Sequence, residues 1–187
     1  AIASTMSAAL LAEFGAQSSL MFLPLALASI GLLCSIGGIV LVKQNASKSP
    51  EKALRMGTMG ASLLFIVLAL LIVLMMDVTA YIWMAVLAGS LGGMIIGLVT
   101  EYYTAGTPVK HIAKSGETGP ATVMITGLSV GMQSVAIPVL TICGVIAISS
   151  HFAGLYGVGI AAVGMLATVG ITMAIDAYGP VADNAGG

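Results

Sequence analysis

Long apolar stretches separated by short polar turns make up this chain. A helix must present about 20 apolar residues to cross the hydrocarbon core of a bilayer. The pattern therefore predicts about five spanning helices preceded by a partial one, together forming an all-α integral membrane bundle. The expected helices cover residues 1–12 (partial), 20–42, 54–76, 82–104, 121–150 and 155–187.

Composition points to the same class of protein. Hydrophobic residues make up 59% of the chain and charged residues only 7%, too few to cover the surface of a soluble domain. The net charge of −1 gives no reason to expect a nucleic-acid partner. Cys34 and Cys143 lie in apolar runs, so we expect them to pack as small hydrophobes. We expect a single transmembrane region, 1–187, that is an internal piece of a longer protein.

The basic residues predict the orientation in the membrane. They fall in or just after two polar loops, 43–53 and 105–120, and the alternate turns carry none. Because basic residues concentrate on the cytoplasmic side, both loops are expected to be cytoplasmic. Counting the crossings onward places Asp176, Asp183 and Glu101 at the same side. The basic residues are Lys43, Lys48, Lys52, Arg55, Lys110 and Lys114.

Small and bulky residues indicate which helices lie inside the bundle. Glycines recur every four residues at Gly89, Gly93 and Gly97, a spacing that lets two helices approach closely. The helix 155–187 carries few bulky side chains, so we expect it to be surrounded by protein. The helix 54–76 is bulky and branched throughout, which favours a lipid-facing position.

The acidic end of the chain carries the candidate chemistry. No Asp, Glu, Lys or Arg occurs over 118–175, and then Asp176 and Asp183 follow seven residues apart. On a helix they project from the same side, about 10 Å apart along the axis. We expect Gly179–Pro180 to interrupt the helical hydrogen-bond ladder between the two acids and so free backbone carbonyl oxygens, and Asn184 adds another neutral oxygen. Hard oxygen ligands of this kind favour Mg²⁺ or Ca²⁺, so the sequence predicts a cation site.

Glu101, near the end of a glycine-striped helix, is the third acidic candidate. Glu101 lies beside Tyr102 and Tyr103 and is either an interfacial anchor or part of an ion path. The residues alone favour the anchor, because tyrosines are enriched at membrane interfaces. Three functions stay open: a primary pump, a secondary cation transporter that uses Asp176 and Asp183, and a structural membrane subunit without chemistry.

Two motifs resemble signatures of the membrane-bound, ion-pumping inorganic pyrophosphatases. One is the run 174–187, AIDAYGPVADNAGG, and the other is the run 97–104, GLVTEYYT. Ala105 stands where the second motif usually continues with Ser. The resemblance implies a homodimer with sixteen transmembrane helices in two rings, of which this chain would supply the end of helix six through helix eleven.

The resemblance also implies an activity and residue roles. Family members hydrolyse pyrophosphate with Mg²⁺ on the cytoplasmic side and export H⁺ or Na⁺, and some require K⁺. Asp183 and Asp176 would be catalytic and, with Asn184, metal-binding, while Glu101 would lie in the ion pathway. We expect a multi-pass protein of a prokaryotic cell membrane, with the lipid bilayer and the remaining helices as partners. Alone, this piece is expected to be inactive.

Overall fold

The computed structural model describes residues 1–9, 18–45 and 50–186, which form helices and contain no strand. The helices are α1 (Ile2–Ala9), α2 (Ser18–Asn45), α3 (Pro50–Met75), α4 (Ala80–Ala105), α5 (Thr107–Ser115), the short 3₁₀ helix η1 (Gly116–Thr118), α6 (Pro120–Met165) and α7 (Val169–Gly186).

Four helical runs in the described part of the chain are long and apolar enough to cross a membrane. This confirms the predicted class, an all-α integral membrane protein. The fourth run is interrupted internally and contains both of the last two helices expected from the sequence. The runs are Ser18–Asn45, Lys52–Met75, Ala80–Thr118 and Pro120–Gly186.

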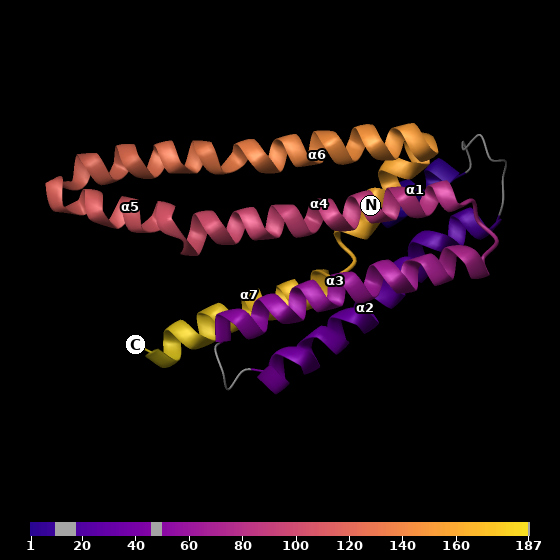
Figure 1. The fold of residues 1–187 in the computed structure, drawn as a ribbon, viewed down its shortest axis with the longest axis horizontal. Coiled ribbons are helices and arrows are strands. Elements are labelled where there is room, and N and C mark those ends of the chain that lie inside the picture. Colours follow the sequence, from indigo (N-terminus) through magenta and orange to yellow (C-terminus); the bar gives the residue numbers. More distant parts are fainter. Residues whose placement is uncertain (10–17, 46–49, 187) are drawn as a thin grey trace.

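The helices run up and down in two layers (Figure 1). One layer holds α4 and α6 side by side, with α5 closing one end of the pair. The other layer holds α2, α3 and α7, with α7 packed on α2 and α3. The C-terminal end of α7 therefore lies at the same end of the molecule as α5 and the start of α3.

A sharp reversal divides α6 into a first leg, residues 120–152, and a second leg, residues 155–165. Ala153 (φ −144°) and Gly154 (φ 57°, ψ −150°) leave the helical conformation there. The positive φ of Gly154 is a conformation that residues with a Cβ adopt rarely, so glycine suits this corner. The second leg then runs back between α4 and α2.

The structure differs from the expected boundaries at two places. The helix expected over 155–187 is interrupted by a turn at 166–168, which separates the second leg from α7. The loop expected over 105–120 contains α5 and η1, because Pro108 favours a helix start and Gly119, at φ 128°, ends the segment.

The polar segment expected over 43–53 is also largely helical where it is described. Lys43 belongs to α2 and Lys52 to α3, whereas Lys48 lies outside the described residues. Of the expected partial helix 1–12, α1 covers Ile2–Ala9, and residues 10–12 lie outside the described part.

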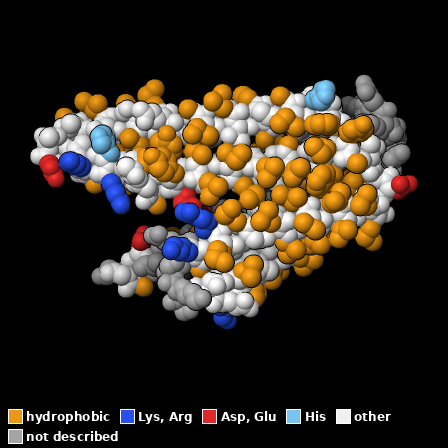
Figure 2. All heavy atoms as spheres, in the orientation of Figure 1, with side chains coloured by type: hydrophobic (Ala, Val, Ile, Leu, Met, Phe, Trp, Pro, Cys, Tyr) orange, Lys and Arg blue, Asp and Glu red, His pale blue; other side chains and the backbone are white. Residues whose placement is uncertain are grey.

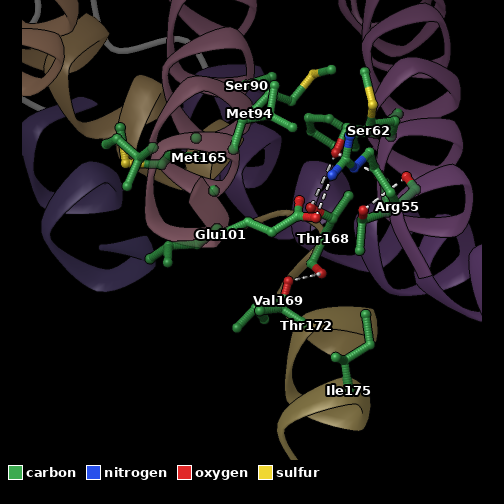
Figure 3. Close-up of a pocket in the computed structure, with 18 of the residues that line it drawn as sticks. Arg55, Ser62, Ser90, Met94, Glu101, Met165, Thr168, Val169, Thr172 and Ile175 are labelled. Carbon is green, nitrogen blue, oxygen red and sulfur yellow. Dashed lines mark hydrogen bonds and ion pairs between the residues drawn. The ribbon is translucent and has the colours of Figure 1, made fainter. Parts of the chain in front are cut away.

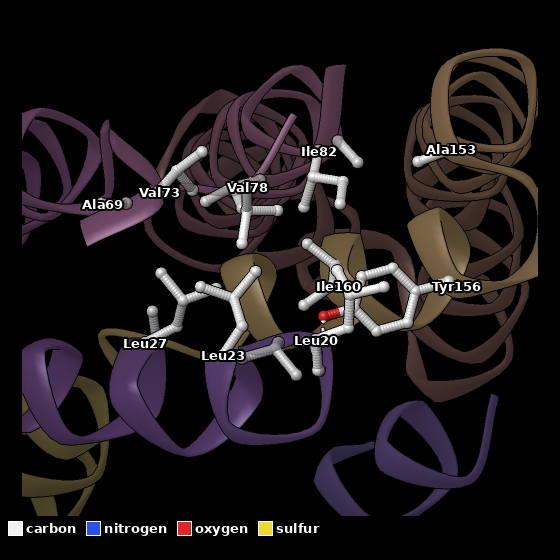
Figure 4. Close-up of a cluster of buried hydrophobic side chains, with 14 of the residues drawn as sticks. Leu20, Leu23, Leu27, Ala69, Val73, Val78, Ile82, Ala153, Tyr156 and Ile160 are labelled. Atoms are coloured by element: carbon white, nitrogen blue, oxygen red, sulfur yellow. Dashed lines mark hydrogen bonds between the residues drawn. The ribbon is translucent and has the colours of Figure 1, made fainter. Parts of the chain in front are cut away.

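The core lies where α2, α3, the start of α4 and the second leg meet (Figure 4). Tyr156 of the second leg is 1% exposed, and its hydroxyl donates a 2.8 Å hydrogen bond to the carbonyl oxygen of Leu20. One face of α3 is buried here, while its opposite face is exposed, as suits a lipid-facing helix. The buried face carries Phe65, Ala69 and Val73, and the exposed face carries Leu63, Val67, Leu71 and Leu74.

Direct backbone contact joins α4 to the second leg. A Cβ added to Gly89 would overlap the carbonyl oxygen of Ala161. The Ser90 hydroxyl donates a 3.3 Å hydrogen bond to the carbonyl oxygen of Gly164. Glycine at position 89 thus allows the two helices to touch, as small residues do in membrane bundles.

Candidate functional site

Basic side chains gather at one end of the molecule. Figure 2 shows the Lys and Arg side chains at the end where α2 stops, α3 begins and α5 lies. Because α7 runs toward the same end, the acidic C-terminal helix approaches this basic region. The remainder of the visible surface is dominated by apolar side chains, as expected for a surface that faces lipid or other helices.

A pocket of about 550 Å³ opens between α3, α4 and the stretch 164–175. Most of its wall is apolar, and its polar groups come from all three sides (Figure 3). The lining polar residues are Arg55, Thr58, Ser62, Ser90, Glu101, Thr168 and Thr172.

An ion pair between Arg55 and Glu101 lies in the wall of this pocket. Arg55 stands one turn into α3 and Glu101 one turn before the end of α4, so the two antiparallel helices bring them together. The Nη2 atom of Arg55 lies 2.5 Å from Oε1 of Glu101. The side chains are 55% and 38% exposed, respectively. The pair is therefore accessible in this part of the protein.

Hydroxyl groups line the deeper part of the pocket. The Ser62 and Thr168 hydroxyl oxygens lie 3.4 Å apart, which joins α3 to the turn before α7. In that turn the amide of Ala167 donates to the carbonyl of Gly164 at 3.4 Å, three residues back instead of four. A chain that leaves helical geometry at membrane depth is tolerated where protein or a water-filled cavity surrounds it.

Asp176, Asp183 and Asn184 lie on α7 with exposed side chains, and they do not line the pocket. The helix α7 continues through Gly179 and Pro180 to Gly186. Pro180 still lacks an N–H, so the carbonyl of Asp176, four residues earlier, has no helical donor. A proline can thus free one oxygen without ending the helix.

The predicted metal ligands Asp176, Asp183 and Asn184 all lie on one helix, α7. The described residues contain no group of three or more His, Cys, Asp or Glu side chains that could hold a metal ion. Mg²⁺, however, is commonly bound through one or two carboxylates together with substrate phosphates and water. The two carboxylates and one amide on α7 are ligands of that chemical type, so they fit a partial site.

Sequence reasoning missed the pairing of Arg55 with Glu101, because it used Arg55 only to set the orientation. Its distinguishing signal is an arginine one turn inside an apolar helix, opposite a glutamate near the end of the following antiparallel helix. It also missed Ser62 and Ser90, because isolated serines in apolar helices carry no spacing signal. Both become notable only when the fold brings them to the pocket.

The fold and its charged end define a multi-helix membrane protein with ionisable groups at one end of the bundle. Over residues 1–187 the sequence matches the family of inorganic H⁺ pyrophosphatases. The chain belongs to this family, which confirms the resemblance found in its two motifs.

Curated relatives extend this comparison. A Bacteroides thetaiotaomicron protein with the provisional name K⁺-stimulated pyrophosphate-energized sodium pump is 47% identical over 181 residues, covering 88% of this chain. The K⁺-stimulated pyrophosphate-energized sodium pump of Thermotoga maritima is 37% identical over 180 residues, covering 88%. The K⁺-insensitive pyrophosphate-energized proton pump of Methanosarcina mazei is 36% identical over 183 residues, covering 92%. The chain spans about a quarter of each relative, 25%, 25% and 27% respectively.

Proposed function

We propose that the complete protein is a primary ion pump that couples Mg²⁺-dependent hydrolysis of pyrophosphate to the export of Na⁺ or H⁺. The observation that carries this proposal is the family match over residues 1–187, which includes both motifs. The fold supports it, since α7, the end of α4 and the basic residues share one end of the bundle. By the positive-inside rule this end is cytoplasmic.

In this proposal Asp183, Asp176 and Asn184 help to hold Mg²⁺ at the cytoplasmic end of α7. Bound Mg²⁺ would neutralise pyrophosphate oxygens and favour cleavage of the phosphoanhydride bond. Asp176 and Asp183 are seven residues apart on one helix, so α7 keeps their spacing fixed near 10 Å along the axis, at roughly 1.5 Å per residue. Their carboxylates would bind Mg²⁺ and orient water. The remaining catalytic groups would come from other helices of the protein.

Glu101 is proposed to lie in the ion pathway. A simple interfacial anchor would need only lipid headgroups and water around it. Instead Glu101 lines a pocket and pairs with an arginine of the neighbouring helix. Ionisable residues of membrane helices that pair with one another often mark ion paths.

The relatives favour Na⁺ as the exported ion and K⁺ as an activator. Two relatives with the provisional name K⁺-stimulated sodium pump are 47% and 45% identical, whereas the sodium pump of Thermotoga maritima, at 37%, is no closer than the proton pumps, at 36% and 37%. We further propose that the protein is a homodimer in a prokaryotic cell membrane. A secondary transporter that needs no pyrophosphate is the alternative, and no relative named here supports it.

The test is phosphate release from pyrophosphate in membrane vesicles that carry the full-length protein. Mg²⁺, Na⁺ and K⁺ are added and withheld in turn, and the ion gradient is recorded in parallel. Release that requires Mg²⁺ and builds a gradient supports the pump, and the response to Na⁺ and K⁺ assigns its subclass. Ion movement without any need for pyrophosphate would favour the transporter instead.

A further inference from the structure

We propose that the pocket between α3, α4 and the stretch 164–175 is a binding site for one anionic phospholipid. An acyl chain of the lipid lies along the apolar wall, and its phosphate group meets lysine side chains at the basic end. This site goes beyond the proposed pump, because neither pyrophosphate nor a transported ion takes part in it.

The lining of the pocket suits a hydrocarbon chain. The pocket measures about 550 Å³, within the range of about 300–1,000 Å³ that is usual for small-ligand sites. Each wall supplies apolar side chains, among them Met59 and Phe65 of α3, Met94 and Leu98 of α4, and Ile175 of α7. Because transfer of apolar surface out of water is favourable, such a wall binds hydrocarbon in preference to water.

The length of the pocket matches one leaflet of a bilayer. Along α3 its lining extends from Leu54 to Phe65, a distance of about 16 Å at a rise of about 1.5 Å per residue. Half of a hydrocarbon core that is about 30 Å thick measures about 15 Å. A single lipid in the leaflet at the basic end therefore has the length to fill the pocket.

A helix that spans the whole membrane does not fit in this space, because α3 and α4 meet beyond it. The indole N–H of Trp83 donates a 3.2 Å hydrogen bond to the carbonyl oxygen of Ile66, which directly follows the lining of α3. Val73 of α3 and Ile82 of α4 are both buried in the core at this side (Figure 4). The space is thus closed at its inner end, and its occupant must be about half as long as a spanning helix.

Charge favours an anionic headgroup at the open end. Lys52 is exposed, lies one turn before Arg55, and shares a face of α3 with Met59, seven residues further on. Lys110 and Lys114 of α5 are also exposed and, four residues apart, project from the same side of that helix. Figure 2 shows the surface hollowed between the two layers at this end, with Lys and Arg side chains on both sides of the hollow.

The acidic group in the pocket does not oppose an anion. Of the described residues that line the pocket, only Glu101 carries a carboxylate, and it pairs with the guanidinium group of Arg55. The pair is neutral as a whole. The lysines near the open end therefore set the sign of the charge that a lipid phosphate meets there.

The experiment uses the full-length protein in phosphatidylcholine vesicles that contain a phosphatidylglycerol with a photoreactive acyl chain. After illumination, mass spectrometry identifies the labelled residues. We expect labels on the lining residues Met59, Met94 and Met165. In Lys52→Gln these labels should fall about fivefold, the contribution of one lysine near a membrane surface to the binding of anionic lipid. Unlabelled phosphatidylglycerol should compete for the site, whereas additional phosphatidylcholine should not.

Gly97→Phe tests the pocket itself, since Gly97 lines it and no atom lies within 4 Å of an added Cβ. The phenyl ring would occupy the space of the acyl chain, so the labels on Met59 and Met94 should be lost while the unfolding temperature is kept. Gly37→Phe on α2 is the matched control. Gly37 also has no atom within 4 Å of an added Cβ, but it does not line the pocket, so G37F should keep the labels.

Three results would overturn the inference. Absence of label from the lining residues would mean that another segment of the protein covers the pocket. Equal labelling by a photoreactive phosphatidylcholine would remove the role of the anionic headgroup, and wild-type labelling in both K52Q and G97F would remove the site. The assay needs neither pyrophosphate nor an ion gradient, so its failure is distinguishable from a failure of the proposed function.

Discussion

The Tyr156 hydroxyl donates a 2.8 Å hydrogen bond to the carbonyl of Leu20, which lies four residues before Pro24 in α2. In a regular helix the amide at position 24 would donate to that carbonyl, but proline has no N–H. A side chain 136 residues away in the sequence therefore satisfies a carbonyl that its own helix cannot. This bond ties the second leg of α6 to the start of α2 inside the core.

Tyr156→Phe should destabilise the protein by about 1–3 kcal/mol, because a buried carbonyl loses its donor. Unfolding of the full-length protein in mixed detergent measures this change. Tyr81→Phe, at an exposed site, is the control and should change stability by less than about 0.5 kcal/mol. In a Pro24→Ala background the loss should shrink, since the amide at position 24 can then donate; an unchanged loss would contradict this account.

Gly89→Ala should destabilise the protein by about 1–3 kcal/mol, because the added methyl group overlaps the backbone of Ala161. Gly97→Ala, on the same helix, is the control, since no atom lies within 4 Å of its added Cβ. The same unfolding measurement applies to both. If both variants match the wild type, α4 and the second leg do not touch at this point.

Asp183→Ala in the full-length protein should lower the rate of pyrophosphate hydrolysis by about 100-fold or more, since it removes a proposed metal ligand beside the reacting phosphates. The control is Asp77→Asn, in the turn between α3 and α4. Asp77 has a φ of 53°, which asparagine tolerates, so D77N should keep both fold and hydrolysis. Near-normal turnover in D183A would remove Asp183 from the site.

Glu101→Gln should reduce ion pumping more than hydrolysis, because the amide keeps the shape of the side chain but loses its charge. Ions moved per pyrophosphate, measured in proteoliposomes, should fall at least about threefold while phosphate release persists. An equal loss of both activities, together with a lower unfolding temperature, would assign Glu101 to folding alone.

The sequence predicted the apolar helices well because apolar length is a strong signal in a membrane protein. That the helix 54–76 faces lipid remains a prediction, which the exposed apolar face of α3 supports. The turn at 166–168 was missed, since Leu166, Ala167 and Thr168 include no proline or glycine that would mark a break. It forms where the second leg is held against α4 while α7 packs on α2 and α3.

The candidate site was predictable only as separate residues. Motif and charge patterns led to Asp176, Asp183 and Glu101, because acidic groups are conspicuous in an apolar chain. The pairing of Glu101 with Arg55 depends on how α3 and α4 align as antiparallel neighbours, which residue spacing does not specify. Whether Asp176 and Asp183 hold Mg²⁺ remains a prediction, since their further ligands belong to other helices in the proposed pump.

The contact between Gly89 and Ala161 has a mechanical consequence for the acidic helix. The second leg is held against α4 at this contact and by the Ser90 hydrogen bond. If α7 tilts relative to α4, the non-helical residues 166–168 between the second leg and α7 are where the backbone can change direction. These three residues would then act as a hinge, and α7, which carries Asp176 and Asp183, would move about it.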